Sequence, residues 1–256
     1  MSRSNVWLAL PSKRPPEEVE PLLRAWRERG YKLAVWRDVG DGDFGTDIAV
    51  ASMTYPGYAV AVNFLCREVL HSDPIAQWIV AAADDILPDP NHSAEEIARE
   101  CSKYFVETAL NDVTKETETP LFEFLGRSAT FGVMQPTGDP WRDIQGRIIE
   151  RIAGSPWIGR EFARRMYGGV GPYWHEYRHC FVDEELQNVA QKLGVFWQRP
   201  DLTHHHQHWA RVEQGKPQAV MPAFLAEANS PEHWVKYKGI FEDRRAKGFP
   251  SHEPIS

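Results

Sequence analysis

The chain has 256 residues, of which 42% are hydrophobic and 25% are charged, and its 36 acidic residues outnumber 29 lysines and arginines to give a net charge of −7. This length is enough for one large domain with its own core, and the composition excludes a globally disordered chain. The acidic balance argues against a wholly basic nucleic-acid-binding protein, although a local basic face stays open. No apolar run approaches the roughly 18 residues of a membrane span, the start lacks a signal-peptide pattern, and the three cysteines are scattered, so we expect a cytoplasmic protein without a disulfide framework.

The N-terminal part of the chain predicts a parallel β–α–β unit. The apolar run VWLAL at 6–10 predicts a strand, the amphipathic run at 17–29 predicts a helix that ends at Gly30, and KLAVW at 32–36 predicts a second strand. A crossover helix between two such strands makes the unit right-handed. Ser12, Lys13 and Arg14 follow the first strand, where they could meet a phosphate or form only a solvated basic turn.

The stretch WIVAAADDILPDP at 78–90 is the most informative part of the sequence. Its apolar run predicts a strand at 78–83 that is buried on both faces, and Asp84 and Asp85 follow it directly. Adjacent carboxylates repel each other unless a cation or a hydrogen-bond network offsets them. Ligands of open α/β sheets bind outside the carboxyl ends of strands, so the pair predicts a ligand site. The alternative is that one carboxylate only caps the turn before Pro88.

The remaining sequence predicts several more elements around these. A helix at 59–70 carries Asn63 in its interior, where an amide needs either solvent or a specific partner. We expect further elements as follows: a helix at 93–105 with Ser93 as N-cap, a strand at 128–135, a helix at 184–193, a strand at 194–198 and a closing helix at 232–245.

The segment 141–178 is rich in arginine and aromatic residues, in contrast to the acidic chain as a whole. Guanidinium groups could meet phosphates, and aromatic rings could stack on a sugar or a base. The alternative is a solvated helix face over an aromatic core. The arginines are Arg142, Arg147, Arg151, Arg160, Arg164, Arg165 and Arg178.

Two later stretches carry residues suited to catalysis or to metal binding. Asp183 precedes the predicted helix at 184–193, where it either caps the helix or acts as a general base that takes a proton from a hydroxyl. Four histidines stand between residues 204 and 208, a pattern that suits a transition metal. On an extended segment His204, His206 and His208 share one side, because side chains alternate. The alternative is a polar loop with one or two structural histidines.

The order of these parts resembles the nucleotide-sugar-dependent glycosyltransferases of the GT-A fold, and glycosyltransferase family 2 in particular. Asp38 matches the acid after the second strand that contacts the nucleotide base, and Asn63 matches the asparagine of the following helix. Asp84 and Asp85 match the last two carboxylates of the family's acidic triplet. Ala83 stands where the first acid of that triplet is expected, which is a departure from the pattern.

The resemblance covers about residues 6–209 and implies a fold and a reaction. The implied fold is a single α/β domain with a Rossmann-like mixed sheet flanked by helices, followed by a helical C-terminal extension at 210–256. The implied reaction is inverting, metal-dependent transfer of a sugar from a UDP-sugar, or another nucleoside-diphosphate sugar, to an acceptor hydroxyl. The implied sheet contains the strands at 6–10, 32–36, 78–83 and 128–135.

The resemblance also implies roles for individual residues. Asp183 would be the base, and Asp85 with His206 or His208 would bind Mn²⁺ or Mg²⁺, which suit carboxylate and imidazole ligands. The residues along the donor would be Pro11, Ser12, Lys13, Asp38, Asn63 and Asp84, and the residues at the acceptor would be Trp157, Arg160 and Arg164.

With its compact single-domain form and its histidine-rich C-terminal end, this region resembles enzymes of tailed bacteriophages. That analogy implies a hydroxymethylated pyrimidine in DNA as the acceptor and the host cytoplasm as the location. Two other functions stay open. One is a non-catalytic nucleic-acid-binding protein, and the other is a metal-dependent nucleotidyltransferase, which also uses an acidic pair at a strand end.

Overall fold

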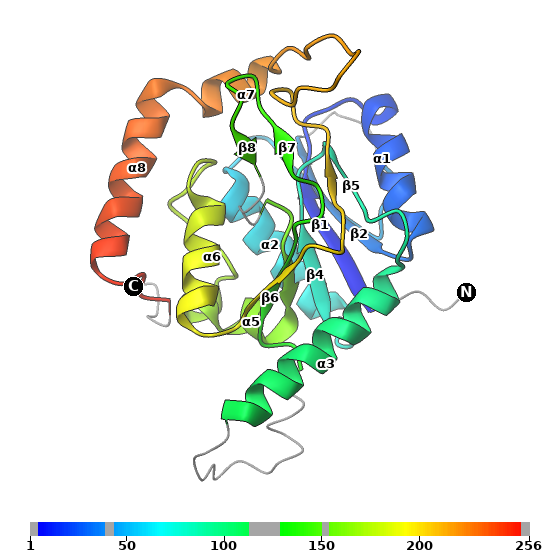
Figure 1. Ribbon diagram of the computed structural model, residues 1–256, viewed down its shortest axis with the longest axis vertical. Coiled ribbons are helices and arrows are strands. Elements are labelled where there is room, and N and C mark those ends of the chain that lie inside the picture. The colour runs from blue at the N-terminus through cyan, green and yellow to red at the C-terminus, as the bar shows by residue number, and fades with distance from the viewer. Residues whose placement is uncertain (1–4, 39–43, 113–128, 150–153, 252–256) are drawn as a thin grey trace.

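A seven-stranded mixed sheet forms the centre of the computed structural model, which describes residues 5–38, 44–112, 129–149 and 154–251 (Figure 1). β9 runs antiparallel to both of its neighbours, and the other neighbouring strands are parallel. In spatial order the strands are β10 (Phe196–Arg199), β6 (Val133–Pro136), β9 (Trp157–Gly159), β4 (Trp78–Ala81), β1 (Val6–Pro11), β2 (Lys32–Asp38) and β3 (Ile48–Ser52).

The predicted α/β architecture and its four predicted strands are confirmed. β1, β2 and β4 begin at the predicted residues, and β6 begins only at Val133. Residue 128, where that strand was expected to begin, lies outside the described ranges. The strands β1 and β4 are buried on both faces, as their continuous apolar runs predict for central strands of a parallel sheet.

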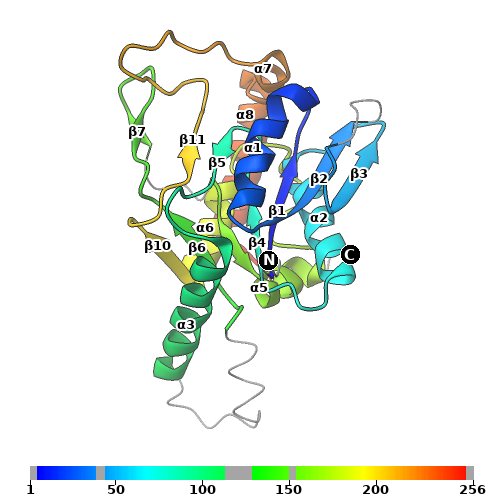
Figure 2. The same ribbon diagram turned by 90° about the vertical axis from the view of Figure 1, so that its right-hand side faces the viewer.

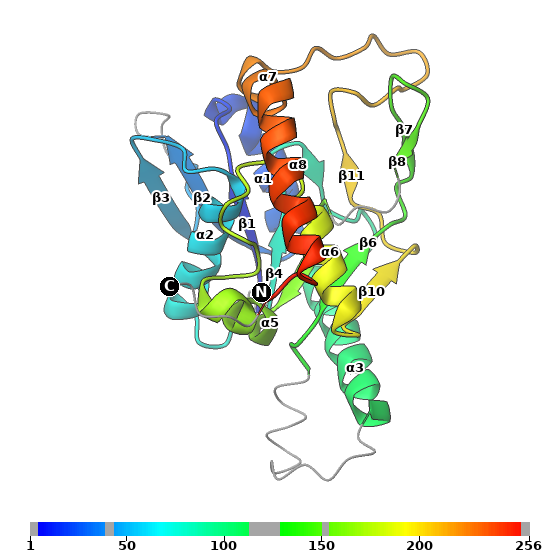
Figure 3. The same cartoon turned by 90° about the vertical axis from the view of Figure 1, so that its left-hand side faces the viewer.

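Helices cover both faces of the sheet. The side chains of β1 alternate between them, with Trp7 and Ala9 in one apolar cluster and Leu8 and Leu10 in the other. Figure 2 shows α1 and α3 in front of the sheet, and Figure 3 shows α6 and α8 on the opposite side. The first face is covered by α1 (Pro16–Glu28) and α3 (Ala94–Asp112), and the second by α2 (Tyr58–Ser72), α5 (Arg160–Arg165), α6 (Val182–Lys192) and α8 (Pro231–Ala246).

Two short antiparallel pairs lie outside the main sheet. β5 (Ile86–Leu87) pairs with β11 (His205–His206), so that Ile86 is opposite His206. β7 (Trp141–Arg142) pairs with β8 (Ile148–Ile149) as a hairpin. The β5–β11 pair brings the end of the acidic stretch next to the histidine-rich segment, which is more than a hundred residues away in the sequence.

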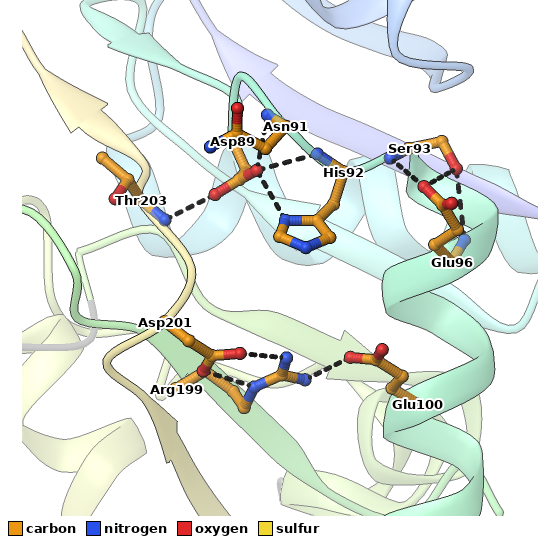
Figure 4. A network of polar contacts seen from close by, with 9 residues as sticks. All are labelled: Asp89, Asn91, His92, Ser93, Glu96, Glu100, Arg199, Asp201 and Thr203. Atoms are coloured by element: carbon orange, nitrogen blue, oxygen red, sulfur yellow. Dashed lines mark hydrogen bonds and ion pairs between the residues drawn. The ribbon is translucent and has the colours of Figure 1, made fainter.

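A network around Asp89 holds this arrangement in place (Figure 4). The buried Asp89 carboxylate accepts hydrogen bonds from the backbone N–H groups of Asn91, His92 and Thr203, at 2.8, 2.9 and 2.7 Å. The Thr203 bond connects the segment before α3 to the segment before β11. Charge-assisted bonds of this kind are stronger than neutral ones, so Asp89 fixes the position of the histidine-rich segment.

The predicted helices are confirmed, and Ser93 caps the start of α3 as predicted from the sequence. Ser93 and Glu96 form a reciprocal capping box at the start of α3, because the Ser93 Oγ accepts from the Glu96 N–H and the Glu96 carboxylate accepts from the Ser93 N–H. In the parts of the chain that the structure describes, no helix is both long and apolar enough to cross a membrane.

The C-terminal segment packs against α6 through buried charges. Arg244 on α8 donates to both carboxylate oxygens of Glu185 on α6, at 2.7–2.9 Å. The hydroxyls of Tyr167 and Tyr177 donate to the same carboxylate, each at 2.7 Å. The Arg244 guanidinium also lies 3.7 Å from the centre of the Trp174 ring. The hydrogen-bonding groups of the Glu185–Arg244 ion pair are therefore almost all satisfied, which is the condition under which a buried ion pair is tolerated.

Candidate active site

A first cavity of about 130 Å³ lies at the carboxyl ends of β1, β2 and β4. Carboxyl ends of parallel strands meet at one edge of a sheet, and this edge is where α/β folds bind ligands. Ser12 and Lys13 follow β1, Asp38 ends β2, and Asp84 follows β4. The wall is formed by Pro11, Ser12, Lys13, Trp36, Asp38, Tyr55, Tyr58, Ala83, Asp84, Arg178 and His179, and by Phe224, Leu225, Glu227 and Ala228 at and before the end of α7 (Ala223–Ala228).

Asp84 is held by two donors from the loop after β1. The Ser12 hydroxyl donates to one carboxylate oxygen at 2.7 Å, and the Arg14 Nε donates to the other at 3.0 Å. Burial raises the pKa of the Asp84 carboxyl, and Ser12 and Arg14 act in the opposite direction. The repulsion expected of the adjacent acids is thus offset at Asp84 by a hydroxyl and a guanidinium, which ties β4 to the loop after β1.

A second ion pair lies in the wall of the first cavity. The Lys13 ammonium is 3.0 Å from one oxygen of Asp38. The other oxygen of Asp38 is buried and has no hydrogen-bond partner in the described part of the chain. A buried acceptor without a partner is costly, so this oxygen is available to an N–H or O–H donor on a ligand.

Asp85 faces away from Asp84 and meets the histidine-rich segment. The His206 Nε2 lies 3.2 Å from Asp85 Oδ1, although the geometry is not that of a hydrogen bond, and this oxygen is buried without one. The Gln207 N–H donates to the Asp85 backbone carbonyl at 2.7 Å and fixes the approach. Burial alone would raise the pKa of the Asp85 carboxyl, but the neighbouring His206 ring lowers it below its usual value.

His206 and His208 differ in the nitrogen that each can offer to a metal ion. The Nδ1 of His208 accepts a hydrogen bond from the Ala210 N–H at 3.1 Å, and burial lowers the pKa of this ring to about 4. The neutral ring then carries its proton on Nε2, which leaves no lone pair toward the site. His206 has its Nε2 beside Asp85, so the geometry favours His206 over His208 as a ligand.

His179 joins the same group of side chains. It lines the first cavity, burial lowers the pKa of its ring, and the Asp85 carboxylate acts in the opposite direction. Within the described ranges, no three His, Cys, Asp or Glu side chains are already arranged as a metal centre. Asp85 and His206, with His179 nearby, are therefore the candidate ligands for a divalent cation.

A second, larger cavity of about 580 Å³ lies on the other side of the acidic stretch. Ala83 and Asp84 line the first cavity and Ile86 lines the second, so Asp85 stands between the two. Asp183, Glu184, His204, His206 and His208 also line the second cavity. The predicted alternation of the histidines is consistent with this placement, since all three reach one cavity.

Asp183 lies in the first turn of α6 and does not cap the helix. The N-cap position is Phe181, and no side chain caps the helix. The half-buried Asp183 carboxylate has no hydrogen-bond partner among the described residues. Burial raises its pKa well above the usual value, and Glu184 raises it further. Burial raises the pKa of Tyr58 in the wall of the first cavity, and the nearby Asp183 carboxylate raises it further.

The structure places four of the predicted site residues away from both cavities. Asn63 is buried, and its side chain bonds to the backbone carbonyl and N–H of Tyr173 at 2.7 and 3.0 Å. This contact supplies the partner that an amide inside a helix needs, and the buried side chain lines neither cavity. Trp157 is fully buried in β9, where its ring packs against Tyr31 at 5.6 Å. Asn63 and Trp157 are thus parts of the core.

Arg160 and Arg164 lie at the opposite edge of the sheet. β9 is antiparallel to β4, with Gly159 opposite Trp78, so α5 begins beside the amino end of β4 (Figure 1). The Arg160 guanidinium donates to the backbone carbonyls of Asp73 and Ala76. The direction of β9 therefore removes both arginines from the candidate site.

The other arginines of the segment 141–178 do not form one basic face. Arg147 pairs with Asp143, Arg165 lies over the ring of Phe131, and Arg178 lines the first cavity. Arg142 donates to the Gly146 carbonyl, and Arg151 lies outside the described residues. Each described arginine of this segment contacts a local partner or lines a cavity.

Several residues at the cavities were not predicted from the sequence. Tyr55, Tyr58 and His179 line the first cavity, and Glu184 lines the second. All except Tyr58 and Glu184 lie in connecting segments, where no periodicity indicates a direction. The one available signal was the cluster of arginine, histidine and aromatic residues around 173–179.

No protein-family model matches the chain, and no curated protein matches it. Among solved structures, the chain is similar to a mutant of Drosophila β-1,4-galactosyltransferase 7 in complex with manganese, UDP-Gal and xylobiose, with 13% identity, a TM-score of 0.39 and coverage of 79% of this chain and 70% of that chain. It is also similar to a glycosyltransferase involved in the glycosylation of the major capsid of PBCV-1, with 8% identity, a TM-score of 0.31 and coverage of 61% of this chain and 60% of that chain. Overlaps this weak assign no activity to the chain.

Proposed function

We propose that the protein is a glycosyltransferase that moves a sugar from a nucleoside-diphosphate sugar to an acceptor hydroxyl. The observation that carries the proposal is a convergence of side chains at one edge of the sheet. Pro11, Ser12, Lys13, Asp38 and Asp84 surround a single cavity. Asp85 lies between this cavity and a second one that is large enough for an acceptor, and Asp183 lines the second cavity.

The first cavity has the groups that a nucleoside-diphosphate sugar requires. Lys13 and Arg178 are the cations in its described wall and would neutralise the diphosphate. Trp36 and Tyr55 offer apolar rings to the base. The unpaired oxygen of Asp38 would accept a hydrogen bond from a base N–H or a ribose hydroxyl. UDP-sugars are the donors we favour, because the N3–H of uracil is such a donor.

The residues at Asp85 fit a divalent cation such as Mn²⁺ or Mg²⁺. The support is the buried Asp85 Oδ1 without a hydrogen bond, next to the Nε2 of His206 at 3.2 Å. A carboxylate with imidazole favours Mn²⁺ over Mg²⁺, which prefers oxygen ligands. A bound cation would neutralise the charge that develops on the departing diphosphate.

Asp183 is the proposed general base. It would take the proton of the acceptor hydroxyl while the acceptor oxygen bonds to the anomeric carbon and the bond from that carbon to the diphosphate oxygen breaks. The products are the glycosylated acceptor, the nucleoside diphosphate and a protonated Asp183. A direct displacement of this kind inverts the anomeric configuration. A raised pKa makes Asp183 a stronger base than an ordinary aspartate.

A hydroxymethylated pyrimidine in phage DNA is the less favoured acceptor. DNA binding needs cations that face the phosphates on either side of the reacting base. Arg160 and Arg164, which were expected to supply them, lie at the opposite edge of the sheet. Among the described Asp, Glu, Lys and Arg residues that line the second cavity, four are acidic and one is an arginine, and the carboxylates repel a polyanion.

Release of nucleoside diphosphate from UDP-, GDP- and ADP-sugars in the presence of Mn²⁺ tests the proposal. We expect slow release of UDP from at least one UDP-sugar, because water can replace the acceptor, and loss of that release in Asp85→Ala. Lys247→Met is the control, since this exposed residue lines neither cavity. Absence of release from every sugar nucleotide, or release of pyrophosphate from nucleoside triphosphates instead, would contradict the proposal and favour a nucleotidyltransferase.

A further inference from the structure

The charges that the structure describes around the second cavity disfavour an acceptor that carries phosphate. Asp139, Asp143, Asp183 and Glu184 line it, and Arg147 is the one lysine or arginine in the described part of its wall. That guanidinium is already paired, because its Nε lies 2.7 Å from Asp143 Oδ2.

Arg211 lies just behind the same wall, and its guanidinium is also paired with carboxylates. Its two terminal nitrogens donate to the two carboxylate oxygens of Asp139, at 2.5 and 2.8 Å, and its Nε is 3.2 Å from Glu213. No unpaired lysine or arginine of the described chain therefore faces this cavity. A phosphate-bearing acceptor would enter a negative cavity without a cation to receive it.

The same cavity has acceptor groups for hydroxyl donors. The carboxylates of Asp183 and Glu184 reach it from adjacent positions in the first turn of α6. Carboxylates are acceptors only, so they suit a ligand with several O–H donors. An uncharged polyol meets this requirement. Its transfer out of water costs little free energy when its hydroxyls form new hydrogen bonds in the cavity.

Aromatic rings complete the wall. Trp141 on β7, Trp209 after β11 and Trp234 on α8 all line the cavity. Trp234 is 50% exposed, and one side of its ring is supported by Phe181, whose ring centre is 4.8 Å away. Rings placed this way offer flat apolar surface next to polar acceptors, which matches the alternation of C–H faces and hydroxyl edges on a pyranose.

Trp234 is also fixed relative to the base. Phe181 is the N-cap of α6, two residues before Asp183, and has a left-handed backbone with φ of 69°. A bulky residue holds this conformation only where its surroundings enforce it. Phe181 packs between Trp234 and Phe241 of α8, so the start of α6 and the Trp234 ring are held as one unit.

We infer that the second cavity binds a neutral carbohydrate acceptor, with a sugar ring on Trp234 and its hydroxyls on Asp183 and Glu184. The inference rests on the proposed glycosyl transfer and narrows its acceptor to an uncharged glycan. The transferred sugar is then added to another sugar. The C-terminal helix α8 contributes the ring that selects this acceptor.

Saturation-transfer NMR on the full chain, with UDP and Mg²⁺ present, tests the inference. The probes are maltose, cellobiose, lactose and a DNA oligonucleotide with 5-hydroxymethylcytosine. We expect ring C–H protons of at least one disaccharide to receive saturation, and Trp234→Ala to weaken that binding about fivefold through loss of the stacked ring. Trp197→Phe is the control, because Trp197 stacks on Tyr104 away from the cavity, and it should bind as the wild type does.

Two results would overturn the inference. One is that no disaccharide binds, and the other is that the DNA binds in a manner that depends on Trp234 while the disaccharides do not. Binding of UDP in the same samples reports on the first cavity separately. Loss of UDP binding with disaccharide binding intact would therefore reject the proposed donor chemistry and leave the carbohydrate site standing.

Discussion

At the scale of single residues, the candidate site contains three carboxylates with different surroundings. Asp84 is compensated by Ser12 and Arg14 and holds the cavity wall together. Asp85 has one buried oxygen without a hydrogen bond next to His206. Asp183 has no hydrogen-bond partner in the described part of the chain, and burial raises its pKa. From these differences we propose a structural role for Asp84, cation binding for Asp85 and proton transfer for Asp183.

Replacement of Asp183 by asparagine tests its role as the base. Asp183→Asn keeps the shape of the side chain but cannot accept the proton, so we expect transfer to fall about 10²–10⁴-fold while UDP binding is unchanged. Glu184→Gln is the matched control in the same cavity wall, and it should affect mainly the KM for the acceptor. Equal loss of kcat in both variants, or more loss in Glu184→Gln, would move the base to Glu184.

The pH dependence of transfer follows from the raised pKa of Asp183. The ionised form is the base, so kcat/KM should be constant at high pH and fall as the pH falls through this pKa. Because burial raises the pKa, the decline should begin well above the range near 3.9 where exposed aspartates titrate. A profile of kcat/KM between pH 4 and 9 measures this. An acidic limb with an unperturbed midpoint would argue against Asp183.

Some site residues were predictable because they stand at strand ends. Ser12, Lys13, Asp38 and Asp84 each follow or end a parallel strand, and the geometry of such a sheet brings them together whatever their distance in sequence. Asn63 was not predictable in this way. Its position in a helix did not reveal that the side chain faces the loop at Tyr173.

At the scale of elements, two contacts position side chains of the candidate site. They are the β5–β11 pair and the contact between α6 and α8. The first brings His206 opposite Ile86 and so beside Asp85. The second fixes α6, which carries Asp183, through the Glu185–Arg244 pair. Neither contact has a signature in local sequence, because two-residue strands and single buried ion pairs have no periodicity. The histidine-rich segment was identified from composition and its pairing with Asp85 from the family resemblance, and the tertiary structure shows how β5 and β11 bring the two together.

The direction of β9 determines where the predicted acceptor residues lie. A short apolar run does not reveal whether it pairs parallel or antiparallel. Because β9 is antiparallel to β4, the chain returns to the amino edge of the sheet and α5 begins there. Trp157, Arg160 and Arg164 were placed at the acceptor through the family resemblance, and no strand was predicted at 157–159.

The buried pair between α6 and α8 predicts a large stability effect. Arg244→Met leaves the Glu185 carboxylate buried without its cation, so we expect the free energy of unfolding to fall by about 3–5 kcal/mol. The control is Lys247→Met on the same helix, since the Asp243–Lys247 pair is 61% and 64% exposed and such pairs contribute less than about 1 kcal/mol. Urea denaturation of both variants measures the difference. Equal effects would show that Arg244 does not anchor α8.

At the scale of the whole molecule, the site is formed by segments from nearly the full described chain. The sheet supplies the first cavity, and the segments after residue 200 supply His206, Trp209 and Trp234. The α/β architecture could be predicted because alternating strands and helices leave few arrangements. The two cavities could not, because they depend on how the C-terminal segment folds back over the sheet, as Figure 3 shows for α8.

Calorimetric titration with UDP, with and without Mn²⁺, tests the central proposal of a nucleotide-sugar site most directly. We expect UDP to bind at least about tenfold more tightly with Mn²⁺, and Asp38→Ala to weaken that binding by about tenfold through loss of a charge-assisted hydrogen bond. Asp243→Ala, an exposed surface substitution, should bind as the wild type does. Absence of UDP binding under both conditions, or binding that ignores both Mn²⁺ and Asp38, would contradict the account.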